Sequence, residues 1–315
     1  MRWGEKPYHS LDYEMKQRFG EKVYRLSLNG GMTCPNRDGT VGTGGCIFCS
    51  AGGSGDFAAP AILPIPEQLR MQKELIAKKR PVHKYIAYFQ AYTNTYAPVA
   101  YLERIFLEAI SDPEVVVLSI ATRPDCLGDE VLALLYRLNQ IKPVWVELGL
   151  QTIHEESARF IRRGYPLSCF DTAVARLRAI GIEVIVHVIL GLPGEDHDAM
   201  LQTCDYLNTC DIQGIKLQLL HILEHTDLAT YYREVGFPVM TKDAYIALLI
   251  DCMEHLSPEI VIHRLTGDGP GALLIAPLWS QSKRAVLNGL HAELKRRDTW
   301  QGRLFGSSCH DFVAP

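Results

Sequence analysis

The sequence lacks the hydrophobic segments that mark membrane and secreted proteins. None of its apolar runs approaches the ~20 residues that a helix needs to span a bilayer. The first residues, MRWGEKPYHSLDYEMKQRFG, are charged and contain no apolar stretch of the kind that a secretory signal needs. The chain has 315 residues, of which 47% are hydrophobic, and this is enough for a large core. We therefore expect a cytoplasmic protein with no membrane partner.

The chain also lacks an overall positive charge and the glycine-rich motifs of nucleotide-binding proteins. Its formal net charge of -4 argues against a uniformly basic nucleic-acid binder. One basic stretch, residues 283–303, carries six Lys and Arg against Glu293 and Asp298. Such a stretch either contacts phosphates or forms the solvated face of a helix, and the sequence favours neither. The turn GLPG at 191–194 matches neither the P-loop nor the dinucleotide-binding pattern.

Cysteine is too unevenly placed for a disulfide framework. The chain has nine, an odd number, and six are scattered, most of them in apolar or helical-looking sequence where a thiol acts as a small buried hydrophobe. The other three, Cys34, Cys46 and Cys49, lie together in CPNRDGTVGTGGCIFCS, residues 34–50. Glycines between the first two let the loop fold back on itself. Clustered thiols in a reducing compartment indicate a metal site.

The spacing of these thiols does not decide which metal they bind. A [4Fe–4S] cluster normally takes four thiolates, so three local thiolates would leave one iron free to bind a small molecule. Structural zinc also takes four ligands, commonly in two closely spaced pairs. No second pair accompanies Cys46 and Cys49, although His9 or a distant cysteine could supply a fourth ligand. The alternatives are therefore an iron–sulfur protein, a zinc-stabilised binding module that is not an enzyme, and thiols that hold no metal.

Short Val- and Ile-rich runs alternate with amphipathic stretches along most of the chain. This alternation predicts buried parallel strands with helices outside them, an α/β fold, and favours a partial (β/α)6 barrel over a doubly wound open sheet. We expect strands at 23–28, 84–91, 115–121, 144–150, 184–190 and 215–220. We expect helices at 66–79, 98–111, 127–140, 154–180 with a break near 164–166, 196–208, 226–235 and 241–256.

The alternation stops after residue 256, which divides the chain into three parts. We expect an N-terminal segment at 1–22, the barrel at 23–256 and a C-terminal extension at 257–315, with a further strand candidate at 259–265. The first thiol follows the first expected strand. In a β/α barrel that is the face where active sites form.

Polar residues recur on one face near the ends of the expected strands. Alternate side chains share a face of a strand, which groups Tyr88 with Gln90 and Tyr92, Ser119 with Ala121 and Arg123, and Glu147 with Gly149 and Gln151. A buried carboxylate is costly unless it is paired. Glu147, inside VWVELGL, should therefore either form a salt bridge with an Arg or Lys or face a ligand.

Two further segments carry candidate substrate-side residues. His187 lies within the strand at 184–190, where it is either a substrate-facing group or a hydrogen-bonded core histidine. HRLTGDGP, which begins at His263, places Arg264 and Asp268 beside a strand end. This segment is either a paired Arg and Asp or a lid over the barrel mouth.

The three-cysteine loop, with Phe48 directly before the last thiol, resembles the radical S-adenosylmethionine (SAM) superfamily. The eleven residues between Cys34 and Cys46 exceed the usual three of that superfamily, but longer gaps occur in its elongator-like branch. The chain is similar to a bacterial family within that branch over nearly its whole length. The motifs that carry this likeness are CPNRDGT with GGCIFC, YFQAYTNTYAP, IATRPDCL, ELGLQT, LGLPGE, and HRLTGD with APLWS.

This resemblance implies a set of cofactors and residues. Three thiolates, Cys34, Cys46 and Cys49, would hold a [4Fe–4S] cluster whose open iron binds SAM, and reductive cleavage of SAM gives a radical that abstracts hydrogen. The SAM-binding residues would be Phe48, Gln90, Tyr92, Ser119, Arg123, Glu147, Gln151, Gly191 and Gly194. The substrate-side candidates are His187, His263, Arg264 and Asp268. The segment RRGY ends in Tyr165, where the branch has a histidine.

The resemblance also implies a substrate class. Members of the branch act largely on tRNA or other modified bases, and the likeness to the bacterial family implies that this chain trims a carboxymethylaminomethyl group to aminomethyl on a wobble uridine of tRNA. The expected electron donor is a flavodoxin or a ferredoxin. The alternative within the same chemistry is a small-molecule or peptide substrate.

Overall fold

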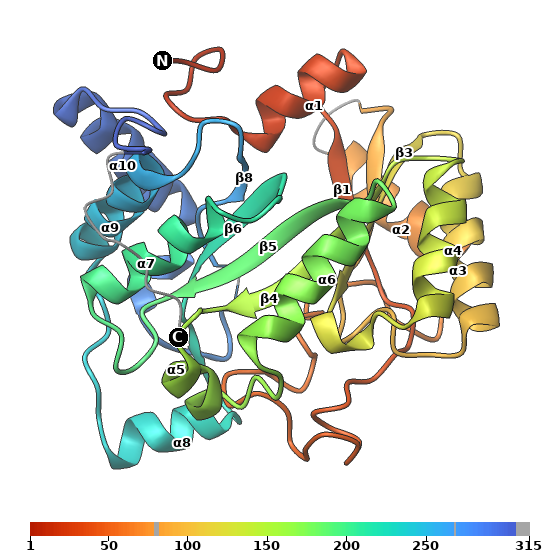
Figure 1. The fold of residues 1–315 in the computed structure, drawn as a ribbon, viewed down its shortest axis with the longest axis horizontal. Helices are drawn as coiled ribbons and strands as arrows, with labels where there is room; N and C mark the ends of the chain where they lie inside the picture. The colour runs from red at the N-terminus through yellow and green to blue at the C-terminus, as the bar shows by residue number, and fades with distance from the viewer. Residues whose placement is uncertain (79–81, 268, 307–315) are drawn as a thin grey trace.

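A curled sheet of parallel strands forms the centre of the computed structural model, which describes residues 1–78, 82–267 and 269–306. Within these residues the sheet has seven strands in the order β1-β2-β3-β4-β5-β6-β8 (Figure 1). The strands are β1 Tyr24–Leu28, β2 Tyr85–Phe89, β3 Val115–Thr122, β4 Val144–Gln151, β5 Glu183–Leu190, β6 Gly214–Leu219 and β8 Val261–Arg264. The α/β partial barrel expected from the sequence is confirmed.

Helices connect successive strands and cover the outer face of the sheet. They are α2 Ile65–Ala77, α3 Val99–Ser111, α4 Asp129–Asn139, α5 Glu155–Phe160, α6 Leu167–Ala179, α7 His197–Leu207, α8 Asp227–Glu234 and α9 Lys242–His255. Side-chain caps begin several of them, as where Asp196 accepts from the amide of Ala199 at 2.9 Å. The break expected near 164–166 separates α5 from α6. No helix in the described parts of the chain has both the length and the hydrophobicity to cross a membrane.

The sheet has one strand more than the six that the sequence predicted for the barrel. The strand candidate at 259–265 is β8, which pairs in parallel with β6 through Gly214 and Val261. The division of the chain at residue 257 stays a prediction. A second sheet consists of two short antiparallel strands, β7 (Ile222–Leu223), which precedes β8 in the chain, and β9 (Leu274–Ala276), which follows it.

A helix that the sequence did not predict closes one end of the barrel. This helix, α1 (Leu11–Phe19), buries Met15 inside the sheet against Ile86, Trp145 and Ile185. The backbone fixes its position, because Ile262 of β8 donates to the carbonyl of His9 at 2.7 Å. Figure 1 shows α1 at one end of the sheet and α5 and α8 at the opposite end. A ligand therefore reaches the interior from the carboxyl ends of the strands.

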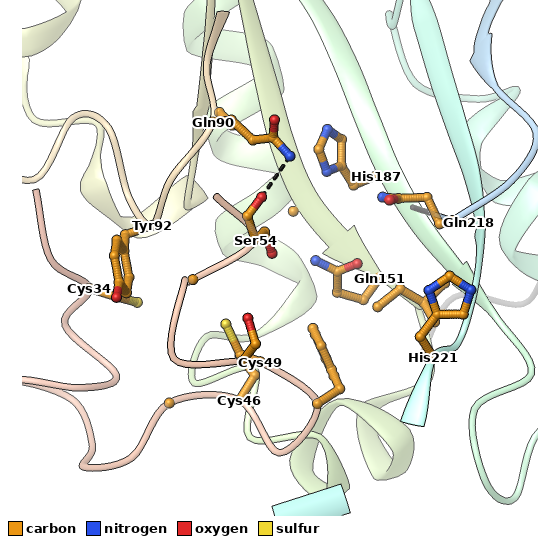
Figure 2. Close-up of a pocket in the computed structure, with 18 of the residues that line it drawn as sticks. Cys34, Cys46, Cys49, Ser54, Gln90, Tyr92, Gln151, His187, Gln218 and His221 are labelled. Atoms are coloured by element: carbon orange, nitrogen blue, oxygen red, sulfur yellow. Dashed lines mark hydrogen bonds between the residues drawn. The ribbon is translucent and has the colours of Figure 1, made fainter. Parts of the chain in front are cut away.

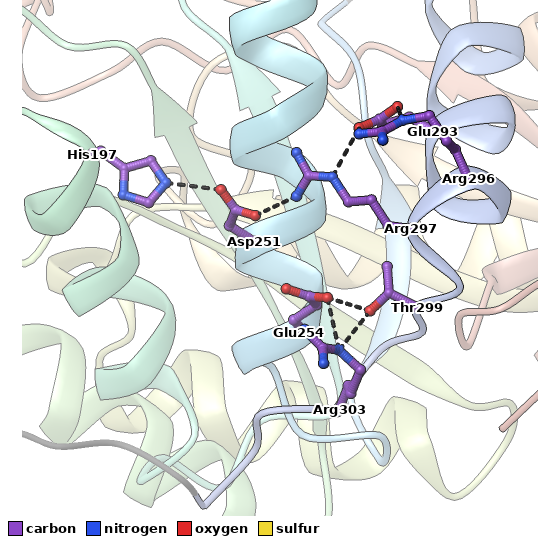
Figure 3. A network of polar contacts seen from close by, with 8 residues as sticks. All are labelled: His197, Asp251, Glu254, Glu293, Arg296, Arg297, Thr299 and Arg303. Carbon is purple, nitrogen blue, oxygen red and sulfur yellow. Dashed lines mark hydrogen bonds and ion pairs between the residues drawn. The ribbon is translucent and has the colours of Figure 1, made fainter.

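The basic stretch at 283–303 contains helix α10, Lys283–Arg297, which packs against α9. Arg297 lies 2.7 Å from Asp251 of α9 and 2.9 Å from Glu293, and Arg296 lies 2.7 Å from Glu293 (Figure 3). Asp251 is also 2.9 Å from His197 of α7. Arg297 thus joins α10 to α9 and, through Asp251, to α7, whereas Arg296 pairs within α10, and this favours the solvated-helix interpretation for this part of the stretch.

Candidate active site

A cavity of about 240 Å³ opens at the carboxyl ends of the strands (Figure 2). One wall is the loop that carries Cys34, Cys46 and Cys49. The other wall is formed by side chains from the sheet and the segments that follow it, among them Tyr88, Gln90, Tyr92, Arg123, Glu147, Gln151, His187, Lys216, Gln218, His221 and Arg264. The sequence-predicted thiols and most of the predicted strand-end residues are therefore brought together.

The cysteine loop is folded on itself by Arg37. The amide of Arg37 donates to the carbonyl of Cys34 at 2.8 Å, and its guanidinium donates to the carbonyls of Cys49 at 3.1 Å and Ser50 at 2.6 Å. Burial raises the pKa of the Cys46 thiol to about 12. Burial also raises the pKa of Cys49, against the opposing effect of Arg37. A metal that binds here must therefore displace protons from the thiols.

The same loop is attached to the rest of the protein through its C-x-x-C turn. The amide of Ile47 donates to the carbonyl of Ile161 at 3.3 Å, and the amide of Leu228, in the first turn of α8, donates to the carbonyl of Ile47 at 2.8 Å. The side chain of Ile47 is buried in a second hydrophobic cluster that includes Ile161 and Leu228, and Phe48 packs against it. Helices α5 and α8 thus hold the turn at the edge of the cavity.

The three thiols fit an iron–sulfur cluster by type and by origin, since one loop presents all of them to one cavity. The amide of Cys49 donates to the carbonyl of Cys46 at 3.0 Å, and Figure 2 shows these two cysteines and Cys34 among the residues that line the cavity. Among the described residues, no three His, Cys, Asp or Glu side chains are grouped closely enough to hold a metal ion. A [4Fe–4S] cluster takes each thiolate on a different iron, so the three sulfur atoms need not meet at one point.

We expect Gly45→Ala to impair cluster loading, because Gly45 has a φ of +86° and an added Cβ would lie 2.9 Å from Nε of Arg37. The left-handed conformation alone costs a residue with a side chain roughly 1–2 kcal/mol. Gly39→Ala is the matched control, since Gly39 has a φ of +93° with nothing within 4 Å of the added atom. After reconstitution, Gly45→Ala should retain severalfold less iron than Gly39→Ala. Equal iron contents would contradict a role for the Arg37 contact.

Several side chains that the resemblance assigns to SAM have protein partners. Gln90 donates to the carbonyl of Ser54 at 2.6 Å, and Tyr92, with a φ of +60°, donates to the carbonyl of Ala51 through its hydroxyl. Arg123 forms a two-point salt bridge with Asp125, at 2.9 and 2.7 Å. Their contact with SAM stays a prediction. In this structure Gln90 and Tyr92 hold the segment after Cys49 over the cavity.

Gln151 has the feature expected of a ligand-binding residue. Its side-chain oxygen is buried and has no hydrogen-bond partner among the described residues, and it lines the cavity. Its backbone has a φ of +70° at an irregularity in the pairing of β4 with β5. Strained backbone of this kind is concentrated at functional sites. The unsatisfied oxygen suits a donor group of a bound ligand such as the SAM amino group.

Three of the predicted SAM-binding residues lie outside the cavity lining. Gly191 and Gly194 both have a φ of +89° and form the turn between β5 and α7. Ser119 is fully buried in β3, where its hydroxyl donates to Oε1 of Glu147 at 2.8 Å. Phe48, by contrast, lines the cavity as expected.

Glu147 is the centre of a polar layer inside the barrel. Its carboxylate is fully buried and accepts from Lys216 of β6 and from Nε2 of His187 of β5, the latter at 2.7 Å. Burial alone would raise the pKa of Glu147, but Lys216, His187 and Arg25 together hold that pKa well below its usual range. The salt-bridge interpretation of Glu147 is therefore confirmed, and the carboxylate is ionised.

His187 is neutral in this layer. Burial and the nearby charge of Lys216 lower its pKa to about 4, against the opposing hydrogen bond to Glu147. Since a carboxylate only accepts hydrogen bonds, Nε2 of His187 carries the proton and Nδ1 carries a lone pair. Lys216, which also donates to the hydroxyl of Tyr88 at 3.1 Å, was not predicted from the sequence. Its position two residues before Gln218 in an otherwise apolar strand was the available signal.

His263 and Arg264 lie on β8, the last strand in the order of the sheet. His263 does not line the cavity but lies beneath the layer, where Nδ1 is 3.0 Å from Nη2 of Arg25 and its ring meets Trp145 edge-on at 5.3 Å. Arg264 lines the cavity. Asp268 lies outside the described residues. Tyr165 lines the cavity and donates to the carbonyl of Gly149, so its role differs from that of an ionisable imidazole.

Comparison with known proteins identifies the class of this site. Residues 36–207 match the profile of the radical SAM superfamily, and residues 212–296 match that of its C-terminal domain. The chain is a radical SAM enzyme, and its cofactors are a [4Fe–4S] cluster and SAM. It belongs to the family that contains the Bacillus subtilis protein YtqA, with which it is 46% identical over 96% of this chain and 94% of that protein.

Other relatives agree with this assignment. Escherichia coli YhcC is 37% identical over 86% of each chain. The solved structure of Elp3 from Methanocaldococcus infernus aligns with a TM-score of 0.68 at 16% identity, covering 89% of this chain and 64% of that one. At that identity the likeness is one of fold, and it shows the same partial barrel.

Proposed function

We propose that this enzyme modifies tRNA by trimming the carboxymethylaminomethyl group of a wobble uridine to aminomethyl. The observation that carries the proposal is the composition of the cavity. One wall presents the three thiols, and the interior presents Lys216 and a neutral His187. A side chain with a carboxylate, a secondary amine and a methylene between them matches these groups.

Distant relatives support a tRNA substrate. A tRNA uridine(34) acetyltransferase of Dehalococcoides mccartyi is 27% identical over 57% of this chain and 38% of its own length. That enzyme is named for the same class of nucleoside, a uridine at position 34 of tRNA. The cavity opens at the exposed mouth of the barrel, where a nucleoside turned out of the anticodon can enter.

The overall conversion is a two-electron oxidation followed by addition of water. The cluster and SAM, when bound, supply the oxidation and yield methionine and 5′-deoxyadenosine. The oxidation converts the bond between the amine nitrogen and the methylene carbon into an imine. Water adds to the imine carbon and the C–N bond breaks, so that the tRNA keeps a primary amine and the carbon fragment leaves as glyoxylate. A flavodoxin or ferredoxin provides the electron that starts the reaction. A tRNA substrate also places the enzyme in the cytoplasm.

The test is mass analysis of nucleosides from tRNA of cells with and without the gene. Loss of the gene should raise the carboxymethylaminomethyl nucleoside and remove the aminomethyl nucleoside and any product made from it. The purified, cluster-loaded enzyme should then convert that tRNA in vitro and release glyoxylate. Unchanged nucleosides in the deleted strain would overturn the proposal and favour a small-molecule or peptide substrate.

We expect the double change Arg296→Ala/Arg297→Ala to lower the free energy of unfolding and to leave the affinity for tRNA nearly unchanged, because both guanidiniums are paired with carboxylates. The urea midpoint should fall, while the salt dependence of tRNA binding should change little. Phosphate contacts make binding depend steeply on salt, so a flatter dependence in the variant would place these arginines on the tRNA after all. Lys295→Ala is the control in the same turn, since it leaves these pairs intact.

A further inference from the structure

Lys216 lines the cavity, and its salt bridge with Glu147 keeps it an ammonium although burial lowers its pKa well below the usual range. An ammonium carries three N–H groups. Two of them are accounted for by Glu147 Oε2 and by the hydroxyl of Tyr88, which are its acceptors among the described residues. The side chain of Lys216 is only 1% exposed, yet it lines the cavity. The third N–H therefore suits an acceptor that enters with the ligand.

His187 offers the complementary group. Its Nε2–H is held by Glu147, and its Nδ1, which bears the lone pair, has no hydrogen-bond partner within residues 1–78, 82–267 and 269–306. The ring lines the cavity, where Figure 2 shows it on the same side as Gln90 and Gln218. Nδ1 therefore suits a donor such as an N–H group of the ligand.

These two groups are neighbours across the sheet. His187 and Lys216 are register partners in adjacent strands β5 and β6. Side chains at such positions stand roughly 5 Å apart. The carboxylate of Glu147 contacts both side chains, so the ammonium of Lys216 and Nδ1 of His187 keep a constant separation.

We propose that Lys216 and His187 form the subsite for the substrate side chain, with Lys216 on its carboxylate and His187 on its amine N–H. This inference rests on the proposed function. It places the methylene between the two contacts, so that the reacting carbon is held at a fixed point in the cavity. Glu147 orients both residues without contacting the substrate. The product, which has lost the carboxylate, keeps one of the two contacts and leaves more readily.

The test is equilibrium binding to the anaerobically prepared, cluster-loaded enzyme. The probes are 5-carboxymethylaminomethyluridine and its methyl ester, which differ in the charge of the carboxyl group. The wild-type enzyme should bind the acid roughly ten- to a hundredfold more tightly than the ester, as expected for loss of one charged hydrogen bond. Lys216→Met should reduce this preference to about one. His187→Phe should weaken both probes and keep the preference for the acid.

Two further variants protect the test from effects on folding. Lys216→Met leaves the buried carboxylate of Glu147 without its cation, so the double change Lys216→Met/Glu147→Gln, which removes both charges, is measured beside it. The control is Lys142→Met. Lys142 donates to the backbone carbonyls of Asp112 and Val115, outside the cavity, and its loss should leave the preference for the acid unchanged.

The outcomes separate this inference from the proposed function. If a folded Lys216 variant keeps the preference for the acid, or if the wild-type enzyme binds both probes equally, the subsite is wrong. The proposed function still stands in that case if the tRNA nucleosides change on loss of the gene. If neither probe binds and the nucleosides do not change, both the subsite and the proposed function are overturned.

Discussion

Replacement of Cys34, Cys46 or Cys49 by Ala is expected to leave the purified protein colourless and unable to cleave SAM. Two thiolates hold a [4Fe–4S] cluster poorly, so each variant should lose nearly all of its iron and the absorbance that the cluster gives. The measurements are iron content, the visible spectrum and 5′-deoxyadenosine formed from SAM under reducing conditions. The loss of SAM cleavage should be complete within detection, which makes this the largest effect we expect.

The matched controls are Cys126→Ala and Cys252→Ala. Cys126 is half-buried and lies near enough to Cys34 for their charges to interact, whereas Cys252 is buried in α9. Both variants should keep four irons in each chain. Should Cys126 prove necessary and Cys34 dispensable, the assignment of the loop would be wrong. Zinc in place of iron in the wild-type protein would favour the alternative interpretation, a zinc-stabilised binding module.

Glu147→Gln should destabilise the protein by about 3–5 kcal/mol, the range for loss of one partner of a buried ion pair. Glutamine keeps the volume of the side chain but leaves the ammonium of Lys216 buried without its counter-charge. The free energy of unfolding, measured by urea denaturation, checks the change. Glu147→Gln/Lys216→Met should recover most of the loss, because neither glutamine nor methionine carries a charge that must be desolvated.

An exposed ion pair provides the comparison for Glu147. Glu114→Gln removes a carboxylate that lies 2.6 Å from Lys73 near the surface. Pairs of this kind contribute about 0–1 kcal/mol, so the change should be small. If Glu147→Gln lowered the free energy of unfolding by less than about 1 kcal/mol, the buried pair of Glu147 and Lys216 would contribute little to stability. SAM affinity in the same variant tests the other expectation, that Glu147 also contacts the cofactor.

Local sequence was enough to predict most of the sheet because strands such as β3, β4 and β5 are short apolar runs rich in valine or isoleucine. The strand expected at 144–150 is found at Val144–Gln151, and that expected at 115–121 at Val115–Thr122. The helix α1 was not predicted, since the sequence around Met15 is mostly polar and the burial of Met15 depends on a contact with the inside of the barrel. The strand β8 was found but its place in the sheet was not, because strand order is a property of the whole chain.

The site was predictable as a set of residues and not as a set of contacts. Alternation along the strands correctly grouped Gln90, Glu147 and Gln151 on the cavity side. Which group pairs with which depends on the register between strands, and this brought Lys216 to Glu147. The partners of Gln90 and Tyr92 come from the segment after the cysteine loop, whose path no local pattern indicates.

The contact between the C-x-x-C turn and α8 bears on when, during synthesis and folding, the turn becomes fixed. Ile47 is made early during synthesis and its partner Leu228 much later, after six strands of the sheet. In a nascent chain the turn can therefore contact Ile161 of the α5 end before it gains its second attachment, Leu228. Metal delivered during translation would meet a loop not yet held by α8, open to oxidation and to zinc. We therefore expect insertion of the cluster to follow the folding of α8 against the turn.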